Sequence, residues 1–301
     1  MPPKTKSNAD ARARAQAKRE AMRRAERNRR RGFLALWGTL GLVVVLVVVL
    51  AVVFTVGHNN DTKSVTAPAS PALVQDLVVP EAALASAGTS GLGSRVVGLT
   101  PITGGDPITT DGKPTVVYVG GEFCPYCAAQ RWALAVALDR FGTFTGLQTT
   151  RSAADDGNYA TLTFVGSTYT SQYVSFDGKE IYDRAKKTIK SQTLDAAAAA
   201  SYKKYGQVGS VPYFTVNNQY KGTVQFNPSD LGTKSADAIA AEISAGQTSL
   251  AKDVLASANI ITAAICKATN GQPAAVCSAA EVTAAATSGL TASAGGSTSH
   301  G

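Results

Sequence analysis

Residues 115–127 read TVVYVGGEFCPYC, and this stretch decides the fold class. It opens with a run of β-branched and aromatic residues, Thr115–Val119, which is typical of a buried strand. After the pair Cys124 and Cys127, apolar residues recur at helical spacing as far as Phe141. Pro125 suits a first helical turn because its missing N–H needs no partner there. The pattern predicts an α/β protein with a Cys-x-x-Cys pair where a strand passes into a helix.

This placement favours redox chemistry. A thiolate at a helix N-terminus is stabilised by unpaired backbone N–H groups, so its pKa falls below the free value of about 8.5. We expect Cys124 to be the exposed nucleophile and Cys127 the resolving thiol. A zinc site would need further ligands, and the two histidines, His58 and His300, fall in segments resembling a linker and a tail. Zinc and an inert disulfide stay as alternatives, but we expect neither a metal nor a cofactor.

The other elements follow from periodicity and turn signals. Val254, Ala258, Ile261 and Ile265 form one apolar face on the last of the expected helices. An Asn217-Asn218 turn is expected to join the last two strands as a hairpin. The strands are expected at 161–165, 173–176, 212–217 and 222–226, and the helices at 194–205, 235–245 and 250–268.

Pro212 heads an expected strand downstream of the cysteine helix. Thioredoxin-fold proteins carry a cis-proline facing the disulfide at this position. The resemblance implies a cis Val211–Pro212 bond, with the Val211 backbone binding an extended substrate segment. Taken alone, Pro212 would be an ordinary trans proline at the start of a strand.

Two blocks carry a family resemblance: GEFCPYCAAQRW at 121–132 and ALDRFG at 137–142. They resemble DUF929, a domain-of-unknown-function family of membrane-anchored, thioredoxin-like prokaryotic proteins without an assigned substrate. The resemblance is expected to cover 73–281. It implies an α/β, thioredoxin-like fold with an enlarged middle segment, as in DsbA-type oxidoreductases, since 84 residues separate Cys127 from Pro212.

The chain departs from thioredoxin at one chemically important position. The buried acid expected on the strand before the motif is missing, and Tyr118 lies in that region. Glu122 is then the nearest carboxylate; we expect it to be exposed, with a proton relay as the alternative. Aromatic residues at 169–182 are assigned to strand packing, with a peptide groove as the alternative: Tyr169, Tyr173, Phe176 and Tyr182.

The charge of +8 belongs to one short arm. Residues 1–31 hold twelve Lys/Arg against three Asp/Glu, a net of +9, so the remainder is near neutral. Residues 32–57 contain no charged side chain and are long enough for a transmembrane helix, an uncleaved signal anchor. The positive-inside rule places the arm in the cytoplasm, where anionic lipid headgroups, rather than nucleic acid, are its expected partner.

Residues 58–72 are predicted to be a linker and 282–301 a disordered tail, leaving 73–281 as the thioredoxin-like domain. Cys266 and Cys277 bracket an Asn270-Gly271 turn and Pro273. In an oxidising compartment they are expected to form a structural disulfide. A second redox pair relaying electrons to Cys124 and Cys127 stays as the alternative.

The sequence therefore predicts a single-pass membrane protein whose extracytoplasmic domain is a thiol–disulfide oxidoreductase. Its expected partners are cysteine-containing envelope or secreted proteins, with a membrane redox partner as a further candidate. The direction of electron flow depends on the redox potential and does not follow from the sequence. The alternative is a non-catalytic, membrane-anchored, thioredoxin-like module that binds peptides.

Overall fold

The strand that leads to the cysteine pair, β4 (Lys113–Gly121), lies at the centre of the largest sheet. Its neighbours are β10 (Tyr213–Val216), which runs antiparallel, and β9 (Ser175–Tyr182), which runs parallel. The sheet is completed by β11 (Tyr220–Lys221), β2 (Thr100–Pro101) and β3 (Thr109–Thr110). The expected buried strand is confirmed, since Val116–Val119 are fully buried.

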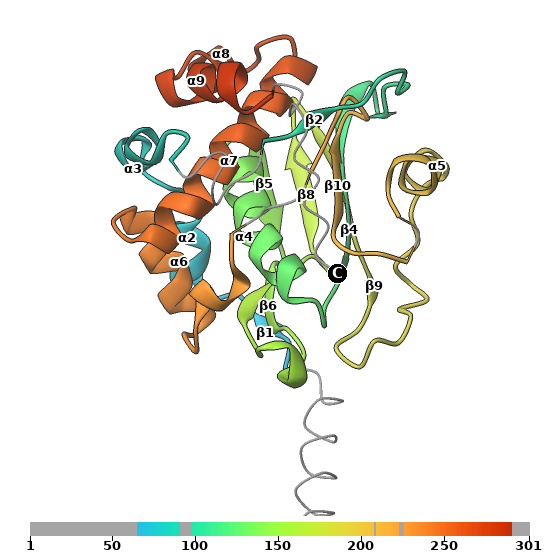
Figure 1. Ribbon diagram of the computed structural model, residues 1–301, viewed down its shortest axis with the longest axis vertical. Coiled ribbons are helices and arrows are strands. Elements are labelled where there is room, and N and C mark those ends of the chain that lie inside the picture. The colour runs from blue at the N-terminus through green and yellow to red at the C-terminus, as the bar shows by residue number, and fades with distance from the viewer. Residues whose placement is uncertain (1–64, 91–97, 208, 223–225, 291–301) are drawn as a thin grey trace, which may run out of the picture. The chain divides into compact units, whose positions relative to one another are not determined.

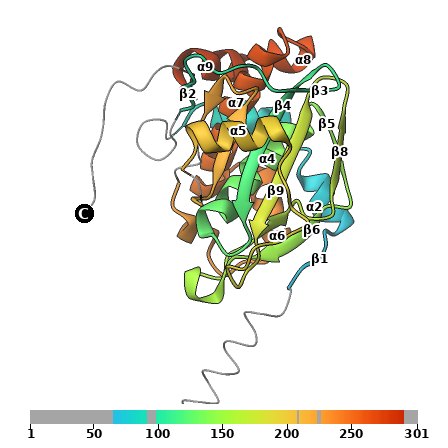
Figure 2. The same ribbon diagram turned by 90° about the vertical axis from the view of Figure 1, so that its right-hand side faces the viewer.

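Helices cover both faces of this sheet (Figures 1 and 2). On one face lie α4 (Pro125–Asp139), α6 (Ala236–Ala245) and α7 (Ser249–Ala268); on the other lies α5 (Ala196–Tyr205). The side chains of β4 alternate between two apolar clusters, as the two-residue period of a strand requires. Val116 and Tyr118 join the large cluster with α4 and α7, and Val117 and Val119 join the small one beneath α5.

The computed structural model describes residues 65–90, 98–207, 209–222 and 226–290. All of them belong to one compact unit, Asp61–Gly301. The predicted arm (1–31), the predicted transmembrane helix (32–57) and the part of the tail from 291 onward lie outside the described residues. The findings therefore establish a mixed α/β domain with several sheets.

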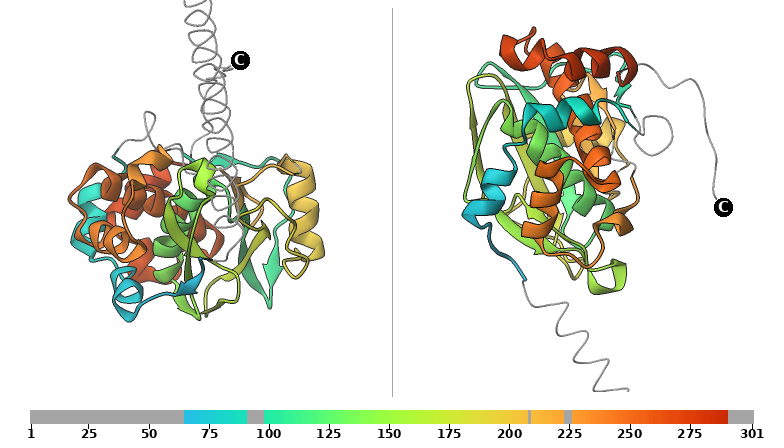
Figure 3. Two further views of the ribbon diagram at one scale, coloured as in Figure 1. Left: turned by 90° about the horizontal axis from the view of Figure 1, so that it is seen from below. Right: turned by 90° about the vertical axis from the view of Figure 1, so that its left-hand side faces the viewer.

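Smaller elements surround the central sheet. The remaining helices are α2 (Pro71–Asp76), α3 (Glu81–Ala87), α8 (Ala274–Cys277) and α9 (Ala280–Ser288), with two short 3-10 helices, η1 (Ala154–Asp156) and η2 (Pro228–Leu231). Helix α2 contacts α6, and α3 contacts α7 (Figure 3). There are also two small antiparallel sheets. One consists of β1 (Ala67–Pro68), β6 (Gln148–Arg151) and β7 (Ala160–Thr163), and the other of β5 (Gly142–Thr145) and β8 (Thr168–Ser171).

The predicted hairpin exists, and its second strand is β11 at Tyr220–Lys221; of the strand predicted at 222–226, residues 223–225 lie outside the described residues. The partner of β10 is β11, with Val216 opposite Tyr220 and the turn at 217–219. Asn217 and Asn218 both adopt a positive φ. Asparagine tolerates the left-handed region of φ and ψ, so the chain turns back directly after Val216 and the second strand starts earlier than the alternating sequence pattern predicted.

Helix α7 differs from its predicted single apolar face. From Leu250 to Cys266 every residue except Lys252 is buried, because α4, α6, α3 and α9 all contact it. Among the described residues α7 is the one helix whose length and apolar composition would suit a membrane span, but it lies in the interior of this domain.

Both predicted boundaries of the globular domain were wrong. Residues 67 and 68 pair with β6, and Ser70 caps α2, so the folded part begins inside the predicted linker. The predicted tail begins with α9, where Val282 and Ala285 are buried against α7. Glu281 also forms an ion pair with Arg140 at 3.0 Å. The helix is therefore held by packing and charge, and its small residues conceal this in the sequence.

Candidate functional site

The cysteine pair sits where β4 ends and α4 begins, as predicted. Cys124 is the N-cap residue of α4, and its Sγ accepts a hydrogen bond from the Cys127 backbone N–H at 3.3 Å. The Cys127 Sγ accepts one from the Gly121 N–H at 3.4 Å. Neither cysteine is in a disulfide. The Cys124 sulfur therefore satisfies one of the N–H groups that a helix start leaves unpaired, and Cys127 lies in the first turn of the same helix.

The expectation that Cys124 is exposed was wrong, whereas its role as the nucleophile stays a prediction. Its exposed fraction is only 5%, and that of Cys127 is 0%. The Val211 carbonyl oxygen lies 3.7 Å from the Cys124 Sγ and helps to cover it. Tyr126, between the two cysteines, is instead 54% exposed.

The two thiols differ in acidity. A hydrogen bond from the Cys127 thiol, helped by the Cys127 and Tyr126 backbone N–H groups, lowers the pKa of Cys124 from 9.0 to about 7, although burial opposes this. Burial raises the pKa of Cys127 well above its ordinary value, and the same hydrogen bond adds to the rise. Near neutral pH the pair therefore carries its negative charge on Cys124.

This asymmetry predicts the pH dependence of alkylation. In the reduced protein, iodoacetamide should modify Cys124 with a midpoint near pH 7, and Cys127 far more slowly across pH 6–9. The lowered pKa also implies that Cys124 contributes stability to the reduced fold that grows as pH rises from about 7 and is lost as pH falls through 7; the raised pKa of Cys127 acts in the opposite sense above the unfolded thiol pKa of about 8.5. Peptide mapping after timed alkylation measures both rates; equal, slow modification would contradict the assigned asymmetry.

The structure brings Val211 and Pro212 to the cysteine pair. The Val211–Pro212 bond is cis, as the resemblance implies. Strand β10 starts at Tyr213, which lies opposite Val119 in the antiparallel register with β4. The first residue of β10 and the last residues of β4 therefore lie side by side, at the same end of these two strands.

A buried ion pair between Arg131 and Glu180 lies close to the two cysteines, and the sequence analysis did not predict it. Arg131 donates from Nε to Glu180 Oε1 at 2.6 Å and from Nη2 to Glu180 Oε2 at 2.9 Å, with both side chains 0% exposed. Arg131 Nη2 also donates to the Gly121 carbonyl at 2.9 Å. The available signal was an arginine four residues after Cys127, on the same face of a helix composed mainly of apolar residues.

A buried acid, Glu180, is present on β9 rather than on β4. Glu180 lies opposite Gly120 in the parallel register. A methyl group at Gly120 would collide with both the Tyr118 hydroxyl and the Glu180 carboxylate. Burial raises the pKa of Tyr118 well above its ordinary value, so this hydroxyl is neutral. Tyr118, Arg131 and Glu180 therefore form one polar cluster inside the apolar core.

Glu122 lies at the edge of this cluster and is not exposed as expected. It is half-buried and accepts a hydrogen bond from the Thr163 hydroxyl at 3.0 Å. Burial raises the pKa of Glu122, while the charge of Arg131 lowers it. A proton-relay role stays a prediction.

The comparisons with known proteins bear on this part of the chain. Residues 103–204 match the model of a family described as "Domain of unknown function (DUF929)". This segment is similar to the DUF929 family. It is shorter than the 73–281 expected from the resemblance, and no curated protein or solved structure matches the chain.

The DUF929 segment contains both cysteines, Arg131 and Glu180, whereas Pro212 lies beyond it. Its aromatic residues pack against one another, as expected for strands: Tyr169 and Phe176 both contact Phe144. Tyr169 also donates a hydrogen bond to the Leu138 carbonyl at 2.7 Å. Tyr182 contacts Phe123, beside which Lys186 lies 5.5 Å from the ring centre.

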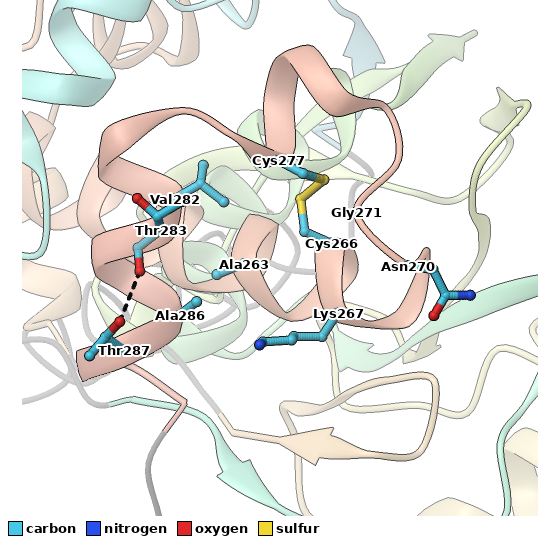
Figure 4. A pocket seen from close by; sticks show the side chains of 10 residues that line it. All are labelled: Ala263, Cys266, Lys267, Asn270, Gly271, Cys277, Val282, Thr283, Ala286 and Thr287. Carbon is cyan, nitrogen blue, oxygen red and sulfur yellow. Dashed lines mark hydrogen bonds between the residues drawn. A yellow bond between two sulfur atoms is a disulfide. The ribbon is translucent and has the colours of Figure 1, made fainter.

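The other two cysteines lie outside the DUF929 segment. Cys266, at the end of α7, and Cys277, at the end of α8, form a disulfide with Cα atoms 5.5 Å apart. Both sulfurs lie in the wall of a cavity of about 550 Å³ between α7, α8 and α9 (Figure 4). The predicted pairing is therefore present; its structural role stays a prediction.

Metal ligands do not gather in the described part of the chain. Among residues 65–90, 98–207, 209–222 and 226–290, no three His, Cys, Asp or Glu side chains are close enough together to hold a metal ion. The predicted linker and tail histidines, His58 and His300, lie outside these ranges.

Proposed function

We propose that this protein is a thiol–disulfide oxidoreductase acting on cysteine-containing proteins through Cys124 and Cys127. The observation that carries the proposal is the Cys124 thiol at the start of α4, with a pKa of about 7, next to the Val211 carbonyl. A thiolate populated at neutral pH is the species that attacks disulfides. An inert structural pair would need no such difference in acidity.

The exchange balances without any cofactor. The Cys124 thiolate attacks one sulfur of a substrate disulfide; the old S–S bond breaks, and the electron pair leaves on the other substrate sulfur. Cys127 then loses its proton and attacks the Cys124 Sγ, which closes the 124–127 disulfide and releases the reduced substrate. In the opposite direction, substrate thiols reduce the 124–127 disulfide by the same two steps.

The second step requires a buried thiol to ionise. Burial opposes it, but the Arg131 guanidinium lowers the pKa of Cys127. Glu180 raises that pKa, yet it also holds Arg131 in place through two hydrogen bonds. We propose Arg131 as the positioning cation for the Cys127 thiolate and Glu180 as the group that orients it.

The proposed fold is thioredoxin-like with an enlarged middle segment. Support comes from the central β4, followed directly by the cysteine helix and flanked by a parallel and an antiparallel strand. The segment between Cys127 and Pro212 adds the sheet of β5 and β8 and two of the three strands, β6 and β7, of the other small sheet. We further propose a single N-terminal membrane anchor and an extracytoplasmic domain, supported by the uncharged run at 32–57 and the basic arm before it.

One observation favours the alternative, a peptide-binding module without turnover. Cys124 is almost completely buried, so a substrate sulfur can reach it only if the Val211–Pro212 segment shifts. In that alternative the 124–127 pair would stay oxidised in cells and would form no covalent intermediate.

Trapping distinguishes the two functions. The Cys127→Ala chain should accumulate mixed disulfides between Cys124 and substrate proteins in cells, because the resolving thiol is gone. Acid quenching, alkylation and non-reducing electrophoresis reveal them as reductant-sensitive bands. The matched control, Cys124→Ala/Cys127→Ala, should show none. Absence of such bands from the single variant, with the wild-type pair found fully oxidised, would favour the binding module.

A further inference from the structure

A cavity of about 350 Å³ lies beside the proposed exchange site. Pro212, which lines it, directly follows Val211, whose carbonyl contacts the Cys124 Sγ. Strand β10 is antiparallel to both β4 and β11. The chain therefore enters β10 on the side of the sheet where it leaves β4 and β11, at the ends of these strands. The cavity therefore lies at the same ends of the strands as the Cys124 thiol.

Among the residues that the structure describes, Lys221 is the one charged side chain that lines this cavity. It ends β11, is half-buried, and donates from Nζ to the Tyr205 carbonyl oxygen at 3.0 Å. Within the described residues no carboxylate forms an ion pair with it. An ammonium has three donors, so two stay available to a ligand.

The rest of the wall suits a polar side chain held against aromatic rings. Tyr205 and Tyr213 contribute rings, and Thr100, Gln207 and Ser210 contribute neutral hydrogen-bonding groups. A cation in a partly enclosed, otherwise uncharged wall attracts an anion more strongly than a fully solvated cation does. The wall therefore selects for a carboxylate and against a second cation.

We infer that Lys221 selects protein substrates that carry Asp or Glu close to the exchanging cysteine. The inference rests on the proposed function. An extended segment advances about 3.3 Å per residue. A substrate whose cysteine meets Cys124 beside Val211 therefore places a residue a few positions away at the cavity that begins at Pro212.

Three matched peptides test this. Each has one cysteine with a run of Glu, of Gln or of Lys on both sides, so that the positions a few residues away from the cysteine also vary, and each carries thiopyridine as a mixed disulfide on that cysteine. The Cys124 thiolate of the reduced full-length chain attacks the peptide sulfur, the S–S bond breaks, and the electron pair leaves with thiopyridine, which is followed by absorbance. At low salt the Glu peptide should react about 3- to 10-fold faster than the Lys peptide, and the ratio should fall as salt screens the charge.

Variants locate the preference. Lys221→Gln should remove it, Lys221→Glu should invert it and Lys221→Arg should keep it. Lys203→Gln is the control, because it removes the same charge from α5 at an exposed site that does not line the cavity. Equal rates for the three peptides, or a Glu preference that survives in Lys221→Gln, would overturn the inference while leaving the proposed function intact. If no peptide releases thiopyridine, the proposed function itself fails.

Discussion

Glu180→Ala should lower the free energy of unfolding by about 3–5 kcal/mol, because it leaves the Arg131 guanidinium buried without its counter-charge. Both side chains are fully buried, and two hydrogen bonds join them. Chemical denaturation of the reduced protein, followed by circular dichroism, measures the change. The Tyr118 hydroxyl lies next to Gly120, as the Glu180 carboxylate does. Because burial raises the pKa of Tyr118, its hydroxyl stays neutral and cannot replace the negative charge of Glu180.

The double variant Arg131→Met/Glu180→Leu separates charge from packing. It removes both charges and keeps similar volume, so it should recover most of the stability that Glu180→Ala loses. It should nevertheless slow the closing of the 124–127 disulfide, since the cation near Cys127 is gone. A double variant as unstable as the single one would show that packing, rather than the unpaired charge, dominates.

The second large effect concerns the other cysteines. Cys266→Ser/Cys277→Ser should lower the free energy of unfolding by about 2–4 kcal/mol, since the disulfide closes a loop over a sequence separation of 11 and restricts the unfolded chain. It also ties α8, none of whose residues is buried, to the end of α7. Thermal and chemical unfolding of the oxidised proteins provide the comparison.

The matched control for this experiment is Cys124→Ser/Cys127→Ser, which keeps the 266–277 disulfide. If that disulfide is structural, its removal leaves the alkylation midpoint of Cys124 near pH 7 unchanged. If it is a relay, its removal instead costs little stability and stops turnover with a membrane partner. A Cys124–Cys266 or Cys124–Cys277 crosslink found by peptide mapping would establish the relay.

Local patterns predicted the junction between β4 and α4 correctly. The apolar run of β4 and the helical spacing after Cys127 are short-range signals, so the strand-to-helix junction and the position of the cysteines could be read from sequence. Long-range pairing could not. Nothing local indicates that β9 pairs in parallel with β4, and this pairing alone brings Glu180 opposite Gly120. The buried acid was consequently sought on the wrong strand.

Segments rich in small residues were the other source of error. An alanine-rich stretch such as 280–288 has the composition of a tail, yet it folds because Val282 and Ala285 pack on α7. Helix stability of this kind comes from tertiary contacts, which a single sequence does not display. The exposure of Cys124 was misjudged for a related reason, since Val211, 87 residues away, covers it.

The distance along the chain between the members of the buried ion pair has a consequence for synthesis. Glu180 is added 49 residues after Arg131. At about 5–20 residues per second, the ribosome takes roughly 2–10 seconds to supply it. During that interval the nascent chain already contains Cys124 and Cys127, but not the carboxylate that orients the cation beneath them. A newly made chain therefore contains both thiols before it contains the complete ion pair that lies next to them.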